Sequence, residues 1–476
     1  MKKGQEMDGT FLAIVDADRI QDYIFAPRQL KLIRGASAIQ REVNLTYSLD
    51  LLNESSYGPG NLEGQEITGT RLDENPGQRW EVVYAGGGNL YVLFRDGKDA
   101  DRFVKAACAL YRKHGATATA SGAIVPWTGT FRATLEQGQE RVMARKTSNG
   151  QPGHAVSGPY WKFCEACGLH PASHWSRYPV TGEHILCQAC YARRRHSERA
   201  PYLDEIAKGL KPPQDFEEIA EAARPDGYLA LVYLDVDRLG RFFEGIDPLP
   251  PELYRYHSLH IRKSVREAVI EGCRATCATG PADGTARFEV LLLGGDDAIV
   301  VMASQYVFEF LRRFRKAFGS KLPNLTFSAG VVWAHHHLPV SQYVYHAKKL
   351  LRSAKAAGGN RVDYLVVSES MVRGLEGRKR ERTLRPYEFP GFEGLAETIR
   401  AWKADGFPSN KVHQLYGMAF HETNQASLDF LYWISRLEER HKNLACNFFR
   451  EGIWREKPWR STGAADLAEL WSFVEG

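Results

Sequence analysis

A short phrase occurs twice in this chain, and the duplication constrains the fold more than any other feature. Residues 12–25 read LAIVDADRIQDYIF, and residues 231–243 read LVYLDVDRLGRFF. Each phrase is an apolar run of strand length, followed by Asp-x-Asp-Arg and another apolar residue. An apolar run that is bounded by turn residues indicates a buried strand. The sequence therefore predicts two strands that each end in a pair of carboxylates.

The residues that follow the second phrase predict an alternation of strands and helices. The expected strands are Tyr228–Asp235, Arg287–Leu293, Ala298–Ala303, Leu325–Ala334 and Arg361–Val367, and the expected helices are 252–278, 304–319 and Val340–Ala357. The sequence GGDD at 294–297 is a tight turn that makes the second and third strands a hairpin. The order β-α-β-β-α-β is the split βαβ plan of palm and nucleotide-cyclase domains.

The first part of the chain repeats this order. Its expected strands are Phe11–Asp16, Glu81–Ala85, Leu90–Phe94 and Thr119–Val125, and its expected helices are 28–52, 98–114 and Phe131–Lys146. The hairpin turn is GGGN at 86–89, and the closing RKTSNG resembles AKAAGGN at 354–360. A repeat that keeps strands and helices in the same order is stronger evidence than either copy alone.

We therefore expect an α+β protein of several domains, since 476 residues are too many for a single core. The expected parts are two ferredoxin-like palm or cyclase domains at 1–150 and 227–370, a zinc-binding module with a connector at 151–226, and a helical C-terminal domain at 371–476. A net charge of +5 permits polyanionic partners without requiring them. No apolar stretch reaches the roughly 18 residues of a membrane span, and no signal peptide is apparent, so we expect a cytoplasmic protein without membrane partners.

Four of the eight cysteines form two CxxC pairs, Cys164 with Cys167 and Cys187 with Cys190. In a reducing compartment this spacing predicts a zinc site with four thiolate ligands. Such a site has no open coordination position, so the Zn²⁺ is expected to be structural. Two disulfides are the alternative. The intervening loop also contains possible competing ligands, which are His170, His174 and His184.

Three carboxylates are expected to meet in the second copy. The split βαβ plan places the first strand beside the hairpin turn, which brings Asp235 near Asp296 and Asp297. These charges repel one another unless a cation neutralises them, and Mg²⁺ or Mn²⁺ prefers such oxygen ligands. Two ions about 3.5–4 Å apart would activate a 3′-hydroxyl and stabilise a leaving pyrophosphate. The main chain at Val236 is expected to assist as a metal ligand.

A basic helix end supplies the complementary charge. Lys348 and Lys355 are seven residues apart, or two helical turns, so they lie on roughly one face. Asn360 and Arg361 follow where the helix ends, and their side chains can turn toward triphosphate oxygens. Each of these features alone is weak evidence. Found in order on the matching elements, they predict a nucleotidyltransferase.

The two copies differ in a way that predicts one active site. Asp16 aligns with Asp235, and both hairpin turns keep glycines that let a nucleotide approach the backbone. The first turn ends in Asn89, which is neutral and cannot help hold two divalent ions. The first copy is therefore expected to bind a nucleotide without catalysis, and a purely scaffolding role is the alternative. The expected nucleotide contacts in the two turns are Gly87, Gly88 and Asn89, and Gly294 and Gly295.

Several motifs resemble a known family. LDVDRLG, GGDD and AKAAGGNR are similar to the palm domains of the large subunit of type III CRISPR effector complexes, a relative of the diguanylate and adenylate cyclases. IQDYIFAPRQLKLIRGAS resembles the opening of that subunit's first palm, and a four-Cys module and a helical C-terminal domain are further family features. The resemblance implies conversion of ATP to cyclic oligoadenylates in antiviral defence. It implies Asp296 and Asp297 as the catalytic pair, Asp235 as a metal ligand and Lys355 as a phosphate contact.

The resemblance also has a limit, because the large subunit often begins with an HD-type nuclease domain. No His-Asp doublet occurs in this sequence, so DNA cleavage by such a domain is not expected. The implied partners are ATP, CRISPR effector subunits, guide RNA and target RNA, while a stand-alone or oligomeric protein is the alternative. Two other functions stay open, a cyclic dinucleotide synthase of the diguanylate cyclase type and a catalytically silent scaffold subunit. The three carboxylates argue against the scaffold.

The run His335-His336-His337 lies just past an expected strand. It has no carboxylate partners in the sequence nearby. We therefore expect a solvated loop there and not a metal site.

Overall fold

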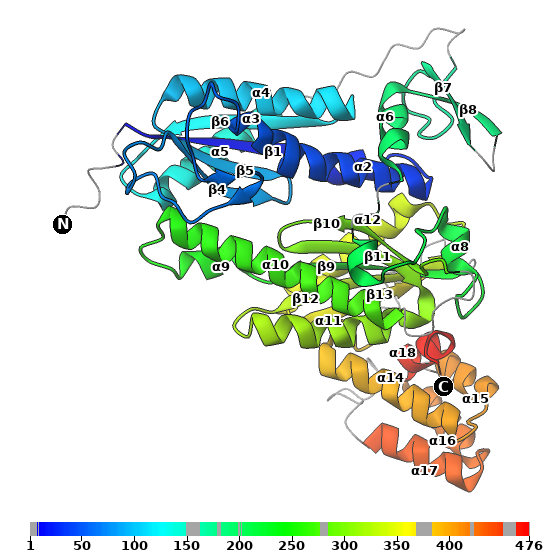
Figure 1. Cartoon of the computed structure of the whole chain (residues 1–476). Coiled ribbons are helices and arrows are strands. Elements are labelled where there is room, and N and C mark those ends of the chain that lie inside the picture. Colours follow the sequence, from blue (N-terminus) through cyan, green and yellow to red (C-terminus); the bar gives the residue numbers. More distant parts are fainter. Residues whose placement is uncertain are drawn as a thin grey trace. The chain divides into compact units, whose positions relative to one another are not determined.

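The computed structural model describes residues 7, 9–148, 162–178, 182–198, 200, 202–276, 284–367, 383–418, 423–450 and 463–475. The chain is a mixed α+β protein that divides into two compact units, each assembled from separate stretches of sequence (Figure 1). Unit 1 comprises Met1–Lys208, Arg238–Glu267 and Leu291–Ala298. Unit 2 comprises Gly209–Asp237, Ala268–Val290 and Ile299–Gly476.

Unit 1 contains a four-stranded sheet in the order β4-β5-β1-β6. Its strands are β1 (Phe11–Asp18), β4 (Trp80–Gly86), β5 (Asn89–Phe94) and β6 (Thr119–Pro126). β1 is central and antiparallel to both β5 and β6, and the register places Asp16 opposite Asn89. Gly87 and Gly88 form the β4–β5 turn with φ of 57° and 87°, a region that favours glycine. Asp16 and Asn89, two predicted site residues of the first copy, are therefore neighbours on adjacent strands.

Helices cover both faces of this sheet. The helices are α1 (Ile20–Ile24), α2 (Leu30–Glu42), the π-helical η2 (Val43–Tyr47), α3 (Ser48–Leu52), α4 (Gly97–Gly115) and α5 (Phe131–Ser148). Gly122 on β6 faces Val104 of α4, whereas Gly138 of α5 lies against Ile14 of β1. Gly122 pairs with Val15, the residue after Ile14, and successive residues of a strand point to opposite faces of the sheet. Gly122 and Ile14 therefore face opposite sides, so α4 and α5 cover different faces.

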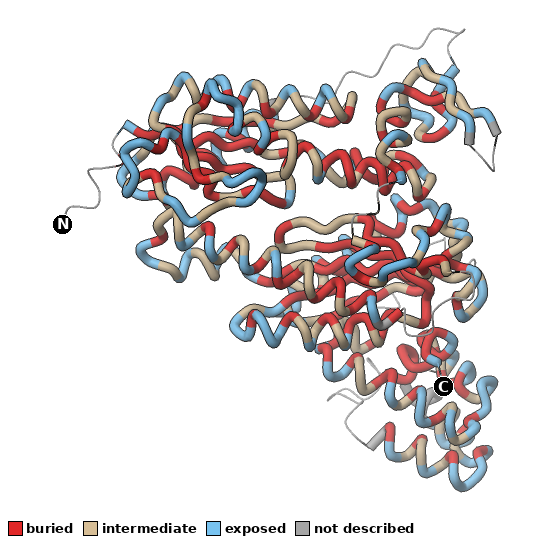
Figure 2. Tube along the Cα trace, viewed as in Figure 1, coloured by how far each residue is buried: buried red, intermediate tan, exposed pale blue. Residues whose placement is uncertain are grey.

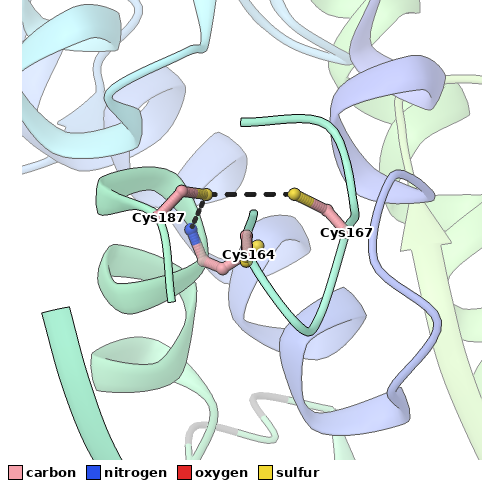
Figure 3. Close-up of side chains that lie close together, drawn as sticks. Cys164, Cys167 and Cys187 are labelled. Carbon is pink, nitrogen blue, oxygen red and sulfur yellow. Dashed lines mark hydrogen bonds between the residues drawn. The ribbon is translucent and has the colours of Figure 1, made fainter. Parts of the chain in front are cut away.

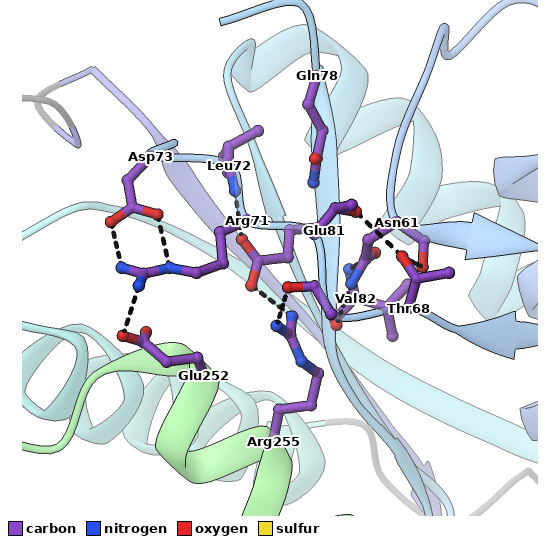
Figure 4. Close-up of polar contacts among 12 residues, drawn as sticks. Asn61, Thr68, Arg71, Leu72, Asp73, Gln78, Glu81, Val82, Glu252 and Arg255 are labelled. Carbon is purple, nitrogen blue, oxygen red and sulfur yellow. Dashed lines mark hydrogen bonds and ion pairs between the residues drawn. The ribbon is translucent and has the colours of Figure 1, made fainter. Parts of the chain in front are cut away.

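A helix from later in the sequence completes unit 1. This is α10 (Pro251–Thr276), which follows the short α9 (Leu239–Glu244) and belongs to unit 1 as far as Glu267. Tyr254 of α10 packs on the core cluster that β1, β5 and α5 share. Arg255 forms a buried ion pair with Glu81 of β4 at 2.6 Å, and Glu81 also accepts from the Leu72 backbone N–H at 2.7 Å (Figure 4). Removing one partner of such a pair leaves a buried unpaired charge, which costs about 3–5 kcal/mol.

Unit 2 is built on a six-stranded sheet in the order β10-β11-β9-β12-β13-β14. Its strands are β9 (Tyr228–Val236), β10 (Phe288–Leu293), β11 (Asp297–Ala303), β12 (Phe327–His335), β13 (Arg361–Val366) and β14 (Tyr387–Glu388). β12 is antiparallel to β9, with Ser328 opposite Asp235, and parallel to β13. Helix α11 (Val307–Lys321) follows β11, and helix α12 (Val340–Ala356) connects β12 to β13. Gly330 of β12 lies directly under α12, where a Cβ would overlap the carbonyl oxygen of Ala347.

The remaining helices of unit 2 follow the sheet. They are α14 (Phe389–Ala404), α15 (Ser409–Met418), α16 (Thr423–Ser435), α17 (Glu439–Arg450) and α18 (Gly463–Leu470). Asp466 of α18 is fully buried and accepts hydrogen bonds from Tyr364 at 2.7 Å and Tyr387 at 2.6 Å, which ties α18 to β13 and β14. Figure 2 shows that buried residues concentrate in the strands of each sheet. Among the described helices, none has the length and apolar character of a membrane span.

The expected strands and helices are largely confirmed, with end shifts of a few residues. The expected helix 28–52 is divided, because a π-helical turn at Val43–Tyr47 separates α2 from α3. Each Asp-x-Asp-Arg phrase also continues into a short helix that was not predicted, α1 or α9. The arginine before each of these helices, Arg19 or Arg238, has a left-handed backbone conformation, with φ of 47° and 53° respectively. The duplication therefore extends to backbone conformation.

Candidate active site and metal centre

Asp235 and Lys355 meet where β9 ends. Asp235 is the last but one residue of β9, and Lys355 lies in the last turn of α12. The Lys355 Nζ lies 2.6 Å from Asp235 Oδ1 and 3.0 Å from the carbonyl oxygen of Val236. Both side chains are about one third exposed, at 32% and 28%. A carboxylate, a main-chain carbonyl and an ammonium group thus lie together at one partly solvent-exposed point.

Asp237 fastens the glycine-rich loop beside this point. It is 5% exposed and accepts hydrogen bonds from Thr326 at 2.8 Å, Ser328 at 2.7 Å and the backbone N–H of Asn360 at 2.7 Å. Gly359 has φ of 81°, and a Cβ there would lie 2.9 Å from the Asp237 carboxylate. The Asp237 carboxylate accepts three hydrogen bonds, one of them from the loop after α12. We therefore regard Asp237 as a residue that positions this loop.

Two further basic residues, Lys348 and Arg361, were predicted near this helix end. Lys348 is exposed on α12. Arg361 forms an ion pair with Glu388 of β14 at 2.7 Å and donates to the carbonyl oxygen of Pro386 at 3.1 Å. Of the four residues named from the sequence, Lys355 contacts Asp235 at the end of β9, and Asn360 contacts Asp237 directly after it.

The first copy repeats the lysine contact. Lys146, near the end of α5, lies 2.8 Å from Asp16 Oδ2 and 3.0 Å from the carbonyl oxygen of Ala17. This matches Lys355 with Asp235 and Val236. Burial raises the pKa of Asp16, while Lys146 opposes the shift. Lys146 was not named as a site residue, although the resemblance between RKTSNG and AKAAGGN marks its position.

The two hairpin turns meet within unit 1. The backbone N–H of Gly294 donates to the carbonyl of Asp297 at 2.9 Å, which closes the GGDD turn. A Cβ on Gly87 would lie 3.1 Å from the backbone nitrogen of Gly295, and a Cβ on Gly295 would overlap the Tyr84 hydroxyl. The glycines are therefore required by close packing of one turn against the other.

Two residues at this contact were not found from the sequence. Arg262 of α10 donates to the carbonyl oxygen of Ala85, just before the first turn. Burial, together with the charge of Asp296, raises the pKa of Tyr84, so its hydroxyl stays protonated and can donate a hydrogen bond. No local pattern distinguishes these residues from ordinary strand and helix positions.

A cavity of about 740 Å³ opens beside the turns in unit 1. Its walls include Gly86–Gly88 of the first turn, Gly294 and Asp297 of the second, and residues of α1 and α2. Three basic residues of α10 also line it, which are Arg262, Lys263 and Arg266. The volume is within the range of about 300–1,000 Å³ that is typical of small-molecule sites.

The four predicted zinc ligands come together in a separate cluster of unit 1 (Figure 3). The ligand atoms of Cys164, Cys167, Cys187 and Cys190 lie within 4.8 Å of one another. All four are free thiols, which excludes the two-disulfide alternative in this structure. Four thiolates that can converge on one point fit a structural Zn²⁺. Two of the three possible competing ligands have contacts outside the cluster, His184 with Glu165 at 3.0 Å and His174 by stacking on Tyr191.

Arg193 connects the cysteine cluster to helices α1 and α2. Arg193 lies in α6 (Gln188–His196), which begins between the last two ligands, and it is 2% exposed. It donates to Cys190 Sγ at 3.4 Å and to the carbonyl oxygen of Tyr23 at 2.7 Å, and it lies over the Tyr23 ring. Its own carbonyl faces Gly35 of α2, where a Cβ would overlap it.

Replacing Gly35 by alanine is therefore expected to destabilise the protein by about 1–3 kcal/mol, because α2 and α6 must separate. Gly319→Ala is the matched control, since nothing lies within 4 Å of a Cβ at that helical glycine. The control should be neutral or slightly more stable. Urea unfolding of zinc-loaded protein measures both. Equal stability of the two variants would mean that the α2–α6 contact is looser than described.

The histidine run lies far from Asp235 along the sheet. His335 pairs with Tyr228 at one end of β9, and Ser328 pairs with Asp235 at the other end. The ligand atoms of His335, His336 and His337 lie within 4.8 Å of one another, and His336 Nδ1 is 3.1 Å from the carbonyl oxygen of Gly227. The run is therefore separate from the site at the end of β9.

Comparison with known proteins gives consistent matches. Residues 228–363 match the family model for the second palm domain of Cas10/Cmr2. The chain is 29% identical over 290 residues to the Cas10/Csm1 single-strand-specific deoxyribonuclease (subtype III-A) of Thermococcus onnurineus. This match covers 57% of the chain and 35% of the relative, so the chain aligns with about a third of that protein.

Solved structures resemble the whole chain. Csm1 of T. onnurineus gives a TM-score of 0.63 with 19% identity, covering 98% of this chain and 69% of that one. The apo Csm1–Csm4 cassette gives 0.62 with 18% identity, covering 98% and 70%. The same cassette in complex with cA4 gives 0.61 with 17% identity, covering 100% and 71%. At these identities the likeness shows a shared fold.

Proposed function

Because this chain belongs to the Cas10 family of large subunits of type III CRISPR effector complexes, we propose that it is a nucleotidyltransferase. In this proposal it converts ATP to cyclic oligoadenylate second messengers, joined 3′ to 5′, in antiviral defence. Two ferredoxin-like palm domains, at 1–150 and 227–370, carry the site. The zinc module with its connector at 151–226 and the helical domain at 371–476 support it.

The observation that carries the proposal is a duplicated contact with one difference. Asp235 with Lys355 and Val236 repeats Asp16 with Lys146 and Ala17. The second copy alone combines this contact with a hairpin turn that contains two carboxylates. A protein that used both copies only as scaffold would not need to concentrate negative charge in one of them.

The donor set suits hard divalent cations. Carboxylate and carbonyl oxygens are the ligands that Mg²⁺ prefers, and Mg²⁺ usually completes its shell with substrate phosphates. Asp235, Asp296, Asp297 and the carbonyl of Val236 would hold Mg²⁺ or Mn²⁺, which supplies activation of the 3′-hydroxyl and neutralisation of the leaving pyrophosphate. Lys355 then exchanges Asp235 for triphosphate oxygens, since its ammonium is a compact charge on a flexible stem.

The first copy is proposed to hold the acceptor nucleotide. Its turn lacks the carboxylates for two ions but keeps the glycines, and Gly87 and Gly88 line the cavity with Gly294 and Asp297. Asp16 and Asn89 lie opposite each other at the end of the first sheet. The acceptor 3′-hydroxyl would then be directed toward the α-phosphate of a donor at the second copy.

Partners of the chain are proposed from the family. Solved structures of Csm1 in complex with Csm4 support other effector subunits as partners, with guide RNA and target RNA as the activating components. Incubation with labelled ATP or GTP and Mg²⁺ or Mn²⁺, with and without these components, tests the function by chromatography. We expect cyclic oligoadenylate from ATP. Product from GTP would identify a cyclic dinucleotide synthase instead, and no product in any mixture would identify a scaffold subunit.

A further inference from the structure

Three histidine rings lie together where β12 ends in unit 2. His335 is the last residue of β12, and His336 and His337 follow it in the turn toward α12. Their ring centroids are 4.4, 4.6 and 4.1 Å apart, and one nitrogen of each ring lies within 4.8 Å of those of the other two. Zinc–nitrogen bonds of about 2.0–2.1 Å place the nitrogens of a tetrahedral site about 3.3 Å apart. Small rotations of the rings are therefore enough to bring all three nitrogens to one ion.

Hydrogen bonds hold the backbone of this turn in place. The His336 N–H donates to the carbonyl oxygen of Gly227 at 2.8 Å, and the Leu338 N–H donates to the carbonyl oxygen of His335 at 2.9 Å. The Tyr343 hydroxyl also donates to the carbonyl oxygen of His335, at 3.0 Å. The rings are thus held near one another by the fold itself, which lowers the entropic cost of gathering them around a ligand.

Gly227, which directly precedes β9, orients two of the rings. His336 Nδ1 lies 3.1 Å from the Gly227 carbonyl oxygen, so Nδ1 carries the proton and Nε2 has the lone pair. Metal-bound histidines commonly donate their other ring N–H to a carbonyl in this way. Gly227 has φ of 74°, and a Cβ there would lie 2.4 Å from His335 Nε2, so the His335 ring packs directly on the glycine. The His337 N–H lies 3.5 Å from His335 Nδ1, a weak contact that a metal bond can replace.

We propose that His335, His336 and His337 bind a Zn²⁺ ion separate from that of the cysteine cluster. The expectation of a solvated loop rested on the lack of nearby carboxylates, but three imidazoles are a sufficient ligand set for zinc. His336 binds through Nε2 and His335 through Nδ1. His337 is exposed, so the fourth coordination position is open to water or to another ligand. This inference is independent of the proposed nucleotidyltransferase activity.

Metal analysis of the full chain tests the ligand set. After dialysis against dilute Zn²⁺, wild type should hold one Zn²⁺ per chain more than His336→Gln combined with His337→Gln. His413→Gln is the control and should match wild type, because His413 is an exposed histidine of α15 outside the clusters of ligand atoms among the described residues. With Co²⁺, the additional site should add visible d–d absorption without thiolate charge transfer. Equal zinc contents in wild type and the double variant would overturn the proposal.

Gly227→Ala tests the geometry without removing a ligand. Its Cβ would displace the His335 ring, so zinc affinity at this site should fall by about 10- to 100-fold, the effect of losing a group that orients a ligand. Gly209→Ala is the matched control, because Gly209 also has a positive φ, of 88°, and nothing lies within 4 Å of a Cβ there. Competition with a chromophoric chelator measures affinity, and thermal unfolding confirms that both variants are folded. Equal affinities in the two variants would overturn the role of Gly227.

A peptide of residues 334–338, Ala-His-His-His-Leu, distinguishes a built site from adventitious binding by a histidine run. The full chain should bind this Zn²⁺ at least about 10-fold more tightly than the peptide, because the fold has already ordered the three side chains. The same chelator competition measures both. Equal affinities of chain and peptide would mean adventitious binding only and would overturn the proposal.

Discussion

Replacing Asp296 and Asp297 together by alanine should reduce cyclic oligoadenylate synthesis by at least about 100-fold. Residues that merely support metal ligands typically contribute about 10- to 100-fold, and these two carboxylates are proposed as ligands themselves. Product formation from labelled ATP with Mg²⁺ measures the effect. Zinc content and thermal unfolding should match wild type, because the main-chain hydrogen bond from the Gly294 N–H to the Asp297 carbonyl oxygen, which closes the turn, is kept in the variant.

Asn89→Ala is the matched change in the first turn. It should reduce the rate less, since Asn89 is proposed to position the acceptor nucleotide and not to hold metal. An equal loss for the two turns would mean that the assignment of donor and acceptor is wrong. Full activity of the double aspartate variant would remove the second copy from the chemistry altogether.

Loss of the zinc ligands should have the largest effect on folding. In Cys164→Ser combined with Cys187→Ser, one Zn²⁺ per chain is lost, and α6 loses the anchor at its start. Structural zinc sites have apparent binding free energies on the order of 10–16 kcal/mol at pH 7, so the module should unfold and release Arg193 from Tyr23. Metal analysis and limited proteolysis of the region around α6 measure these changes.

Cys446→Ser is the control, because Cys446 is a free thiol outside the cluster. It should keep both its zinc and the wild-type proteolysis pattern. If the double serine variant lost its zinc but resisted protease as wild type does, the metal would not be a structural element of the module.

Short-range patterns predicted the parts of the fold that depend on neighbours in sequence. Apolar runs that end in Asp-x-Asp located β1 and β9, and the GGDD sequence located the turn between β10 and β11. The CxxC spacing found the cysteine cluster. The strands and the turn depend on residues close together in sequence, so periodicity and turn chemistry suffice for them. The cysteine cluster joins two pairs about twenty residues apart, and there the ligand spacing is the evidence.

The missed residues depend on contacts between distant segments. Arg255 looks like any polar position on an amphipathic helix, and its pairing with Glu81 appears only when α10 is placed on β4. Tyr84 reads as an ordinary strand residue until the GGDD turn is packed on its hydroxyl. Gln40 is polar in a helix that would be expected to expose it, yet it is buried. Lys146 is different, since the repeat itself contained enough information to identify it.

The ion pair between Arg255 and Glu81 has a consequence for how this protein can be dissected. Cutting the chain between the two copies would not yield two independent domains, because the part of α10 up to Glu267 belongs to unit 1 although it follows the second phrase. A fragment that ended before β9 would bury the Glu81 carboxylate without its guanidinium and expose the aromatic surface on which Tyr254 packs. Residues that follow the second phrase therefore form part of the framework of unit 1, so unit 1 cannot be made from the first half of the chain alone.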